Sequence, residues 1–242
     1  MTTIAAARPA STVVLLRDTH KGLETLLLKR NKALLFAGGF WVFPGGAVDA
    51  QDLAQAGGDE REASRIAAAR EALEEAGVQP RLEDMVQLSH WTTPVVEPRR
   101  FSTWFYAAPL AADDRVVIDG SEIHDAQWLA VREAMAEHEA GALAMLPPTY
   151  ITLGRLAVYD TVAQAVATER ERPIPEILPV FSEDAGQMIV MFPGDAGYAC
   201  TDGSRAGVRH RAVLEGHRWR YIYECVDQDH PPLLGEPARD EQ

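Results

Sequence analysis

The stretch Arg70-Glu71-Ala72-Leu73-Glu74-Glu75-Ala76-Gly77 decides how this chain folds. It closes a segment, residues 59–76, that is rich in Ala, Glu, Arg and Leu and contains neither Gly nor Pro. These residue types favour a helix, and a glycine directly after them is a common place for a helix to end. The sequence therefore predicts a helix over residues 59–76 that stops at Gly77.

Three carboxylates lie on one side of this predicted helix. At about 100° per residue, Glu71, Glu74 and Glu75 spread over one face. The residues of the opposite face, which we expect in the core, are Ile66, Ala69, Leu73 and Ala76. Carboxylates held close together repel one another, and a divalent cation neutralises them; oxygen ligands favour Mg²⁺ or Mn²⁺. The alternative is a solvated acidic face, because Glu is a good helix former.

The wider pattern resembles the box of the Nudix hydrolases. That box reads Gly, five residues, Glu, seven residues, then Arg-Glu-U-x-Glu-Glu-x-Gly-U, where U is bulky and aliphatic. Residues 70–78 match its second half, with Ala72 as a small occupant of the first U position. Counted back from Arg70, Glu62 takes the place of the first Glu, but fifteen residues separate it from Gly46. Ten extra residues are then expected to loop out, and whether Glu62 binds metal, pairs with Arg70 or caps the helix stays open.

The resemblance implies an α/β fold, namely an α/β/α sandwich with a mixed sheet. It also implies a hydrolase that cleaves a nucleoside diphosphate linked to another group, with Mg²⁺ or Mn²⁺ as the cofactor. Carried over by position, Glu71 and Glu75 are metal ligands, Glu74 is a ligand or the general base, and Gly46 is a ligand through its carbonyl oxygen. Arg70 would orient the carboxylates for catalysis.

A second resemblance concerns the substrate. The segment before the box is similar to the signature of coenzyme A diphosphatases, and Arg30, Gly39 and Phe43 fall in register with it. It implies that coenzyme A or its acyl esters are cleaved to 3′,5′-ADP and a 4′-phosphopantetheine moiety, with Arg30 and Gly39 in substrate binding. Because Leu35 replaces a second Arg, ADP-ribose, NADH or a nucleotide sugar remains an alternative substrate. A non-catalytic module that senses nucleotides is the third hypothesis.

The segment Arg99-Arg100-Phe101 is similar to one in the mammalian peroxisomal branch of these diphosphatases, which also has an enlarged box. We expect Arg99, Arg100 and Phe101 to present two cations and a ring to a phosphorylated adenosine. A solvated arginine pair is the alternative. Glu97 and Glu122 are candidates for a further carboxylate that binds metal or acts as a base, and an ordinary surface position is the alternative for both.

Apolar runs on either side of the box predict a sheet. Residues 12–16 and 25–28 predict a β-hairpin, and residues 40–43 predict a strand before the glycine turn. The strands expected after the box are residues 86–90, 102–107 and 126–129. The helices expected after it are residues 131–139 and a long helix from Pro147 toward Glu171. We expect residues 1–170 to form the Nudix domain.

The last third of the chain has a different pattern. Residues 187–192, 211–214 and 218–225 predict strands, the last two joined by a hairpin turn. We expect a C-terminal β extension over residues 171–230 that packs on the main domain. Residues 231–242 are rich in Pro and charge and are expected to form a flexible tail.

Composition limits the partners of the protein. The 242 residues are 47% hydrophobic and carry 36 acidic against 23 basic side chains, a formal net charge of −13. That charge disfavours binding to nucleic acid or anionic membranes, so we expect a small nucleotide diphosphate as the partner. No apolar run reaches the roughly 18 residues of a membrane span, and we expect no membrane contact.

The cysteines and histidines indicate the cellular compartment and show no spacing of a further metal site. Cys200 and Cys225 fit neither metal-ligand nor disulfide spacing, and the chain shows no targeting segment, which together indicate a cytoplasmic protein. His90, His124 and His138 show no metal-ligand spacing either and are expected to be structural. Homodimerisation through the early strands or the C-terminal extension stays open.

Overall fold

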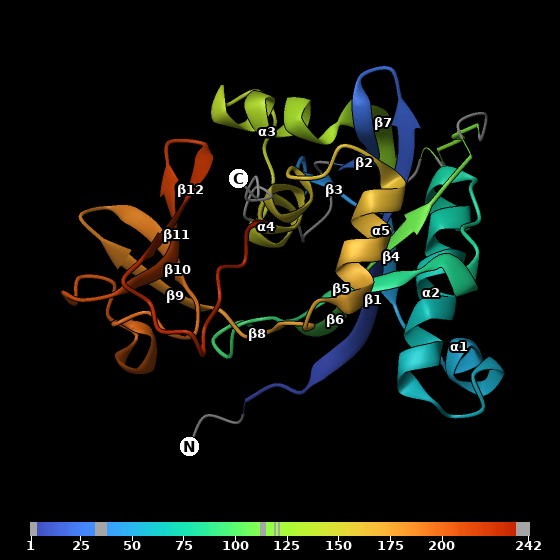
Figure 1. Ribbon diagram of the computed structural model, residues 1–242. Helices are drawn as coiled ribbons and strands as arrows, with labels where there is room; N and C mark the ends of the chain where they lie inside the picture. Colours follow the sequence, from blue (N-terminus) through green and yellow to red (C-terminus); the bar gives the residue numbers. More distant parts are fainter. Residues whose placement is uncertain (1–3, 32–37, 112–114, 119, 121, 236–242) are drawn as a thin grey trace.

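A long antiparallel hairpin forms the centre of the fold (Figure 1). A computed structural model describes residues 4–31, 38–111, 115–118, 120 and 122–235 of the chain. The hairpin strands, β1 (Ala7–Thr19) and β2 (Gly22–Arg30), meet at a turn in which Thr19 lies opposite Gly22. Gly22 has a φ of +99°, a conformation that glycine adopts without steric cost. The predicted hairpin is confirmed, and both strands extend beyond the apolar runs that predicted them.

Among the described residues, eight strands form the main sheet. Besides β1 and β2 they are β3 (Trp41–Val42), β4 (Gly45–Ala47), β5 (Val86–Thr92), β6 (Arg100–Pro109), β7 (Ile123–Ala130) and β8 (Glu176–Ile177). The strand order is β3-β2-β1-β6-β5-β8, with β4 also paired to β1 and β7 also paired to β2. Strand β1 runs antiparallel to β2 and parallel to β6, so the sheet is mixed, as expected.

Helices cover both faces of this sheet (Figure 1). They are α1 (Ala50–Gln55) and α2 (Glu60–Ala76) on one side, and α3 (Val131–Glu139), α4 (Pro147–Leu156) and α5 (Val162–Glu171) on the other. Successive side chains of β1 point to opposite faces, so Val13 and Leu15 join the core cluster of α2, whereas Val14 and Leu16 join that of α4. The expected α/β/α sandwich is confirmed.

Helix α2 begins and ends where the sequence predicts. The Asp59 side chain accepts the Glu62 N–H at 2.8 Å, and Gly77 ends the helix in the left-handed conformation with a φ of +69°. The prediction that Leu73 faces the core is wrong, because its side chain is 47% exposed. The buried side of the helix consists mainly of alanines, which let the helix lie close to the strands, and residue 73 faces solvent as a result. These alanines are Ala63, Ala67, Ala68, Ala69, Ala72 and Ala76.

The long helix expected from Pro147 toward Glu171 is two helices, so that prediction was wrong. Helix α4 ends at Leu156 and α5 begins at Val162. Thr161 has an extended backbone, and its hydroxyl accepts the Gln164 N–H at 3.2 Å. This N-cap satisfies a donor at the start of α5 and favours a new helix over a continuous one. The strands predicted near residues 86, 102 and 126 and the helix over residues 131–139 are confirmed.

A second, antiparallel sheet follows, with the order β12-β11-β10-β9. Its strands are β9 (Val180–Asp184), β10 (Gln187–Met191), β11 (Arg209–Glu215) and β12 (Arg218–Glu224), of which only β9 was not predicted. The sheet packs on the main domain: the Trp219 backbone N–H donates to His138 Nε2 at 2.7 Å, and the Trp219 indole N–H donates to the Met145 carbonyl at 3.0 Å. Buried Val190 and Phe192 belong to the same core cluster as α4.

The first residues of the expected tail are packed against the protein. Leu233 is buried, and its backbone N–H donates to the Tyr221 hydroxyl at 3.0 Å. Residues 236–242 lie outside the described residues. Cys200 and Cys225 are free and exposed. Within the described part of the chain, no helix is long and apolar enough to cross a membrane.

Candidate active site

The glycine strand β4 lies directly against helix α2. It pairs with β1, with Gly45 opposite Thr12 and Gly46 opposite Ser11. A Cβ atom on Gly45 would overlap the Thr12 side chain and the Ser11 carbonyl, and a Cβ on Gly46 would overlap the Glu71 carboxylate. Only glycine permits this close approach of backbone to carboxylate. The strand thus forms a backbone cradle for the acidic end of α2.

Glu75 is the most deeply placed of the helix carboxylates, with 7% of its surface exposed. Its Oε2 accepts the Gly45 N–H at 3.0 Å, and its Oε1 lies 3.9 Å from the Arg30 guanidinium. Burial raises the pKa of Glu75 to about 7, and the negative charge of Glu71 acts in the same direction. The protein therefore holds an acid here that is easily neutralised by a proton or a cation.

Glu71 and Glu74 lie progressively closer to solvent. Glu71 Oε1 accepts a hydrogen bond from Arg70 at 2.9 Å, and burial raises the pKa of Glu71. Glu74 Oε2 accepts from the same Arg70 nitrogen at 3.2 Å, and its side chain is 57% exposed. The three carboxylates predicted from the helix thus lie at three depths rather than on one solvated face.

Arg70 connects the helix carboxylates to helix α1. Its Nε and one terminal nitrogen donate to the two oxygens of Asp52 at 3.1 and 3.0 Å. The same terminal nitrogen donates to the Ala47 carbonyl at 3.0 Å. Asp52 and Glu71 raise the pKa of Arg70, chiefly through the hydrogen bonds that Arg70 donates to Asp52. Every nitrogen of the guanidinium is engaged, and the group that we expected to orient the carboxylates is itself held in place.

Asp52 is the residue that the sequence reasoning missed. It is 1% exposed, and five residues separate it from Gly46. The spacing of the box, Gly followed by five residues and an acid, is therefore intact, with Asp in the place of Glu. The ten extra residues therefore lie between Asp52 and Arg70, and not between the glycine and the first acid. Counting forward from Gly46 to either acidic residue type would have found it.

The extra residues do not simply loop out, since α1 forms at their start. Asp49 caps this helix by accepting the N–H groups of Gln51 and Asp52 at 2.7 and 2.9 Å, and Asp52 accepts the Asp49 N–H in return. Glu62 lies at the far end of α2, where its carboxylate pairs with Arg65 at 3.6 Å and not with Arg70. The structure thus separates Glu62 from the other box carboxylates.

Arg30 of β2 and Glu122, just before β7, complete the group. Arg30, at the end of β2, donates to Glu122 Oε2 at 3.1 Å, so Glu122, just before β7, meets the helix carboxylates through this arginine. The charge of Glu122 helps to raise the pKa of both Glu71 and Glu75. Gly39 supports Arg30 by donating its N–H to the Arg30 carbonyl at 2.9 Å. Leu35 lies outside the described residues.

The segment with Arg99, Arg100 and Phe101 lies elsewhere. Arg100 pairs with Ala7 along β1, whereas Gly46 pairs with Ser11. Four residues of strand correspond to about 13 Å, so this segment does not adjoin the carboxylates. Arg100 donates to the carbonyls of Thr93 and Ala5 at 3.0 and 2.8 Å and anchors the start of the chain. Glu97 precedes it in the same loop, between Pro94 and the strand.

The histidines have structural partners. His90 lies between Glu176 at 2.6 Å and Ser102 at 2.8 Å and stacks on Trp104. His138 is fully buried, and its Nδ1 donates to the Leu143 carbonyl at 2.8 Å. His124 is exposed at the start of β7.

The donor set fits a hard divalent cation. The charges of Glu71 and Glu122 help to raise the pKa of Glu75, and the charges of Glu74 and Glu122 help to raise the pKa of Glu71. The glycine strand brings its backbone against Glu71. Carboxylate and carbonyl oxygens are the ligands that Mg²⁺ and Mn²⁺ prefer. Within the described ranges, no group of three acidic, His or Cys side chains is arranged to hold an ion, and arginines pair with Glu71, Glu75 and Glu122.

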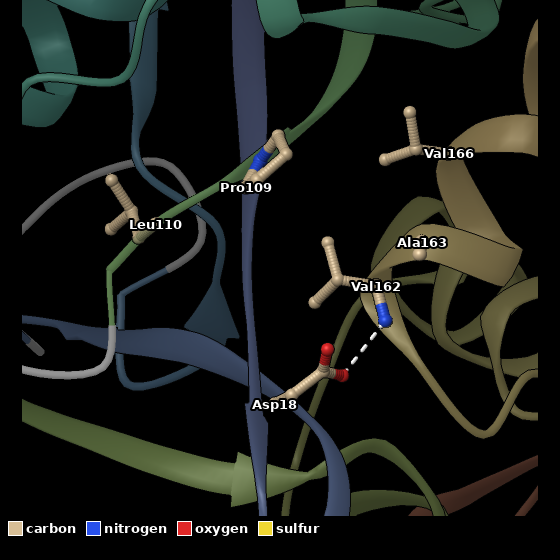
Figure 2. A pocket seen from close by; sticks show the side chains of 6 residues that line it. All are labelled: Asp18, Pro109, Leu110, Val162, Ala163 and Val166. Carbon is tan, nitrogen blue, oxygen red and sulfur yellow. Dashed lines mark hydrogen bonds between the residues drawn. The ribbon is translucent and has the colours of Figure 1, made fainter.

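A hollow of about 470 Å³ lies on the other side of the molecule, beside α5 (Figure 2). It is lined by Asp18, Pro109, Leu110, Val162, Ala163 and Val166. Its one charged group, Asp18, already accepts the Val162 N–H at 2.8 Å. Because the described residues of its lining include a carboxylate and no cation, it does not suit a phosphate-bearing ligand.

The chain is similar to several known proteins. The model of the NUDIX domain matches residues 7–147. Nudix hydrolase 7 of Caenorhabditis elegans is 30% identical over 230 residues, which cover 79% of this chain and 74% of that protein. The acyl-coenzyme A diphosphatase NUDT19 of Xenopus laevis is 24% identical over 123 residues, 48% of this chain and 32% of that protein. A NUDIX hydrolase structure from Alicyclobacillus acidocaldarius superposes with a TM-score of 0.64 at 24% identity, over 71% of this chain and all of that one.

Proposed function

This chain belongs to the Nudix family of hydrolases that act on diphosphate bonds, and from that membership we propose that it cleaves coenzyme A or acyl-coenzyme A. The products are 3′,5′-ADP and 4′-phosphopantetheine or its acyl form. The observation that carries the proposal is the acidic end of α2 held against Gly45 and Gly46, with Arg30 beside it. The similarity to an acyl-coenzyme A diphosphatase and the register of Arg30 and Gly39 support this substrate.

Different residues of the site have different roles in the proposed hydrolysis. Glu71, Glu75 and Glu122, with Glu74 and the Gly46 carbonyl, would hold Mg²⁺ or Mn²⁺, which neutralises diphosphate charge and lowers the pKa of attacking water. Arg70, tied to Asp52, keeps the Glu71 and Glu74 carboxylates in position. Glu74, the most exposed of the three α2 carboxylates, would accept the proton that the attacking water loses as the bridging P–O bond breaks.

A second candidate substrate group is ADP-ribose, NADH or a nucleotide sugar. It is favoured by Leu35, which lacks the second cation of the coenzyme A signature. A third reading is a module that binds nucleotides without hydrolysis. All three share the acidic site and differ in turnover and in substrate preference.

The deciding experiment is hydrolysis of a substrate panel at fixed Mg²⁺, with products separated by chromatography. We expect 3′,5′-ADP from coenzyme A with the highest kcat/KM. A higher kcat/KM for ADP-ribose, NADH or a nucleotide sugar selects the second candidate, and tight binding without any product selects the third. Glu75→Gln should lose several orders of magnitude in kcat. Glu62→Gln, the same change elsewhere on α2, should match the wild type.

A further inference from the structure

Arg30 lies between two carboxylates that come from different elements. One terminal nitrogen donates to Glu122 at 3.1 Å, and the other lies 3.9 Å from Glu75. The side chain is 19% exposed, so these contacts are only partly screened by water. A single positive charge is thus shared by the end of α2 and the start of β7.

The backbone fixes where this guanidinium can go. The Arg30 N–H donates to the Phe40 carbonyl at 3.1 Å, and the Arg30 carbonyl accepts the Gly39 N–H at 2.9 Å. The pairing of β2 with β7 shifts register between Lys29 and Arg30, a bulge that re-aims the side chain. These backbone hydrogen bonds and the bulge therefore place the Arg30 side chain next to the acidic site.

The side chain is nevertheless incompletely bound. Its Nε is buried and has no hydrogen-bond partner among the described residues, and the contact with Glu75 is too long for a hydrogen bond. Arg70 differs, since all of its guanidinium nitrogens donate within 3.2 Å. Buried arginines that serve only structure are normally satisfied in the way Arg70 is. Apart from its hydrogen bond to Glu122, the Arg30 guanidinium is held at the site by the charge of Glu75.

We propose that Arg30 is an internal counter-ion that competes with the divalent cation for Glu75 and Glu122, and that cation binding releases it to bind a substrate phosphate. The proposal rests on the proposed function, because it assumes that these carboxylates receive the cation. One guanidinium offsets one of the three charges on Glu71, Glu75 and Glu122, whereas a divalent ion brings two charges to the same oxygens. The released guanidinium has the forked geometry that suits phosphate oxygens.

This exchange couples the two ligands. Cation binding makes Arg30 available to the diphosphate, so each ligand raises the affinity for the other by the same factor. If Arg30 only held the two carboxylates in place, its removal would have the opposite effect on cation affinity. Glu75 and Glu122 would then move apart, and the cation would bind more weakly.

The test is calorimetric titration of the cation-free protein with Mn²⁺ alone, and then with α,β-methylene-ADP, a non-hydrolysable diphosphate, with and without Mn²⁺. Arg30→Gln should bind Mn²⁺ about tenfold more tightly than the wild type and should lose most of the mutual enhancement between Mn²⁺ and the diphosphate. Arg132→Gln is the matched control, since Arg132 pairs with Asp160 on the surface, and it should match the wild type.

Equal or weaker Mn²⁺ binding by folded Arg30→Gln overturns the proposal. Where that variant does not fold, Arg30→Lys keeps the charge but loses the fork, and full wild-type enhancement in Arg30→Lys would equally contradict it. Failure of the proposed function looks different: the wild type itself would bind no Mn²⁺ or hydrolyse no diphosphate.

Discussion

Asp52 acts on the carboxylates of α2 through Arg70. It is buried and gives both oxygens to one guanidinium, which in turn touches Glu71 and Glu74. Removing one partner of a buried pair leaves the other uncompensated. Asp52 thus positions the site without touching the substrate.

Asp52→Asn should lower kcat by about 10- to 100-fold, the usual effect of losing a group that supports metal ligands. The amide offers one acceptor in place of two, so Arg70 loses its fixed orientation. Steady-state kinetics with separate kcat and KM values tests this, with Asp59→Asn as the control, because Asn caps a helix as well as Asp. Wild-type kcat in Asp52→Asn would exclude the positioning role.

Gly46→Ala tests the backbone cradle. The added methyl group would overlap the Glu71 carboxylate, so the side chain or strand β4 must shift. A displacement of about 1 Å at such a site costs about 100-fold in rate. Turnover should fall by that order while the melting temperature shows that the fold persists, and unchanged turnover would mean that the close approach has no catalytic role.

At the scale of single residues, the sequence pattern predicts that Glu71, Glu74 and Glu75 lie on one side of the helix. It does not predict that the three side chains differ in burial. The buried side of α2 consists mainly of alanines, of which the predicted core face includes only Ala69 and Ala76, whereas Leu73, the large apolar residue predicted beside them, is exposed. Glu122 could be named from the sequence, but its approach to Arg30 depends on the pairing of β7 with β2, which no local signal specifies.

At the scale of elements, helix α1 supports the site, because it carries Asp52, the residue that holds Arg70. Its cap, Asp49, accepts two backbone N–H groups, and its third residue is Asp52. Elements with strong local signals were predictable: Asp59 and Gly77 bound α2, and residues 131–139 form α3. Strands β8 and β9 were not, because short strands owe their existence to partners distant in the sequence.

Asp49→Ala removes the cap of α1. We expect the free energy of unfolding to fall by about 1 kcal/mol, the ordinary contribution of an N-cap side chain. Urea denaturation measures it, with the exposed Asp229→Ala as the control. Unchanged stability would show that Asp52 and Arg70 hold α1 without its cap.

At the scale of the whole molecule, a histidine of α3 joins the C-terminal sheet to the main domain. His138 Nε2 must be unprotonated to accept the Trp219 N–H, and burial lowers the pKa of His138. Burial lowers the pKa of His210 in the second sheet as well. The attachment of the C-terminal sheet is therefore sensitive to acid.

The sign of the effect follows from proton uptake. Both histidines are neutral in the folded and unfolded states above the unfolded pKa of about 6.5, and below it the unfolded state takes up protons first. Their contribution to stability is therefore complete above that pH and is lost as pH falls. The raised pKa of Glu75 acts oppositely, since the folded state then holds the extra proton. Urea denaturation at pH 7.5 and 5.5 should show a smaller acid-induced loss of stability in His138→Gln than in wild type; equal losses would contradict this role.

The most direct measurement is the dissociation constant of Mn²⁺ for the wild type, Glu75→Gln and Glu62→Gln, determined by calorimetry on cation-free protein. We predict that Glu75→Gln loses at least about tenfold in affinity, as expected when a ligand carboxylate of a divalent ion is removed. Glu62→Gln should bind like the wild type. Equal affinity in all three proteins would contradict the assignment of the acidic end of α2 as the cation site.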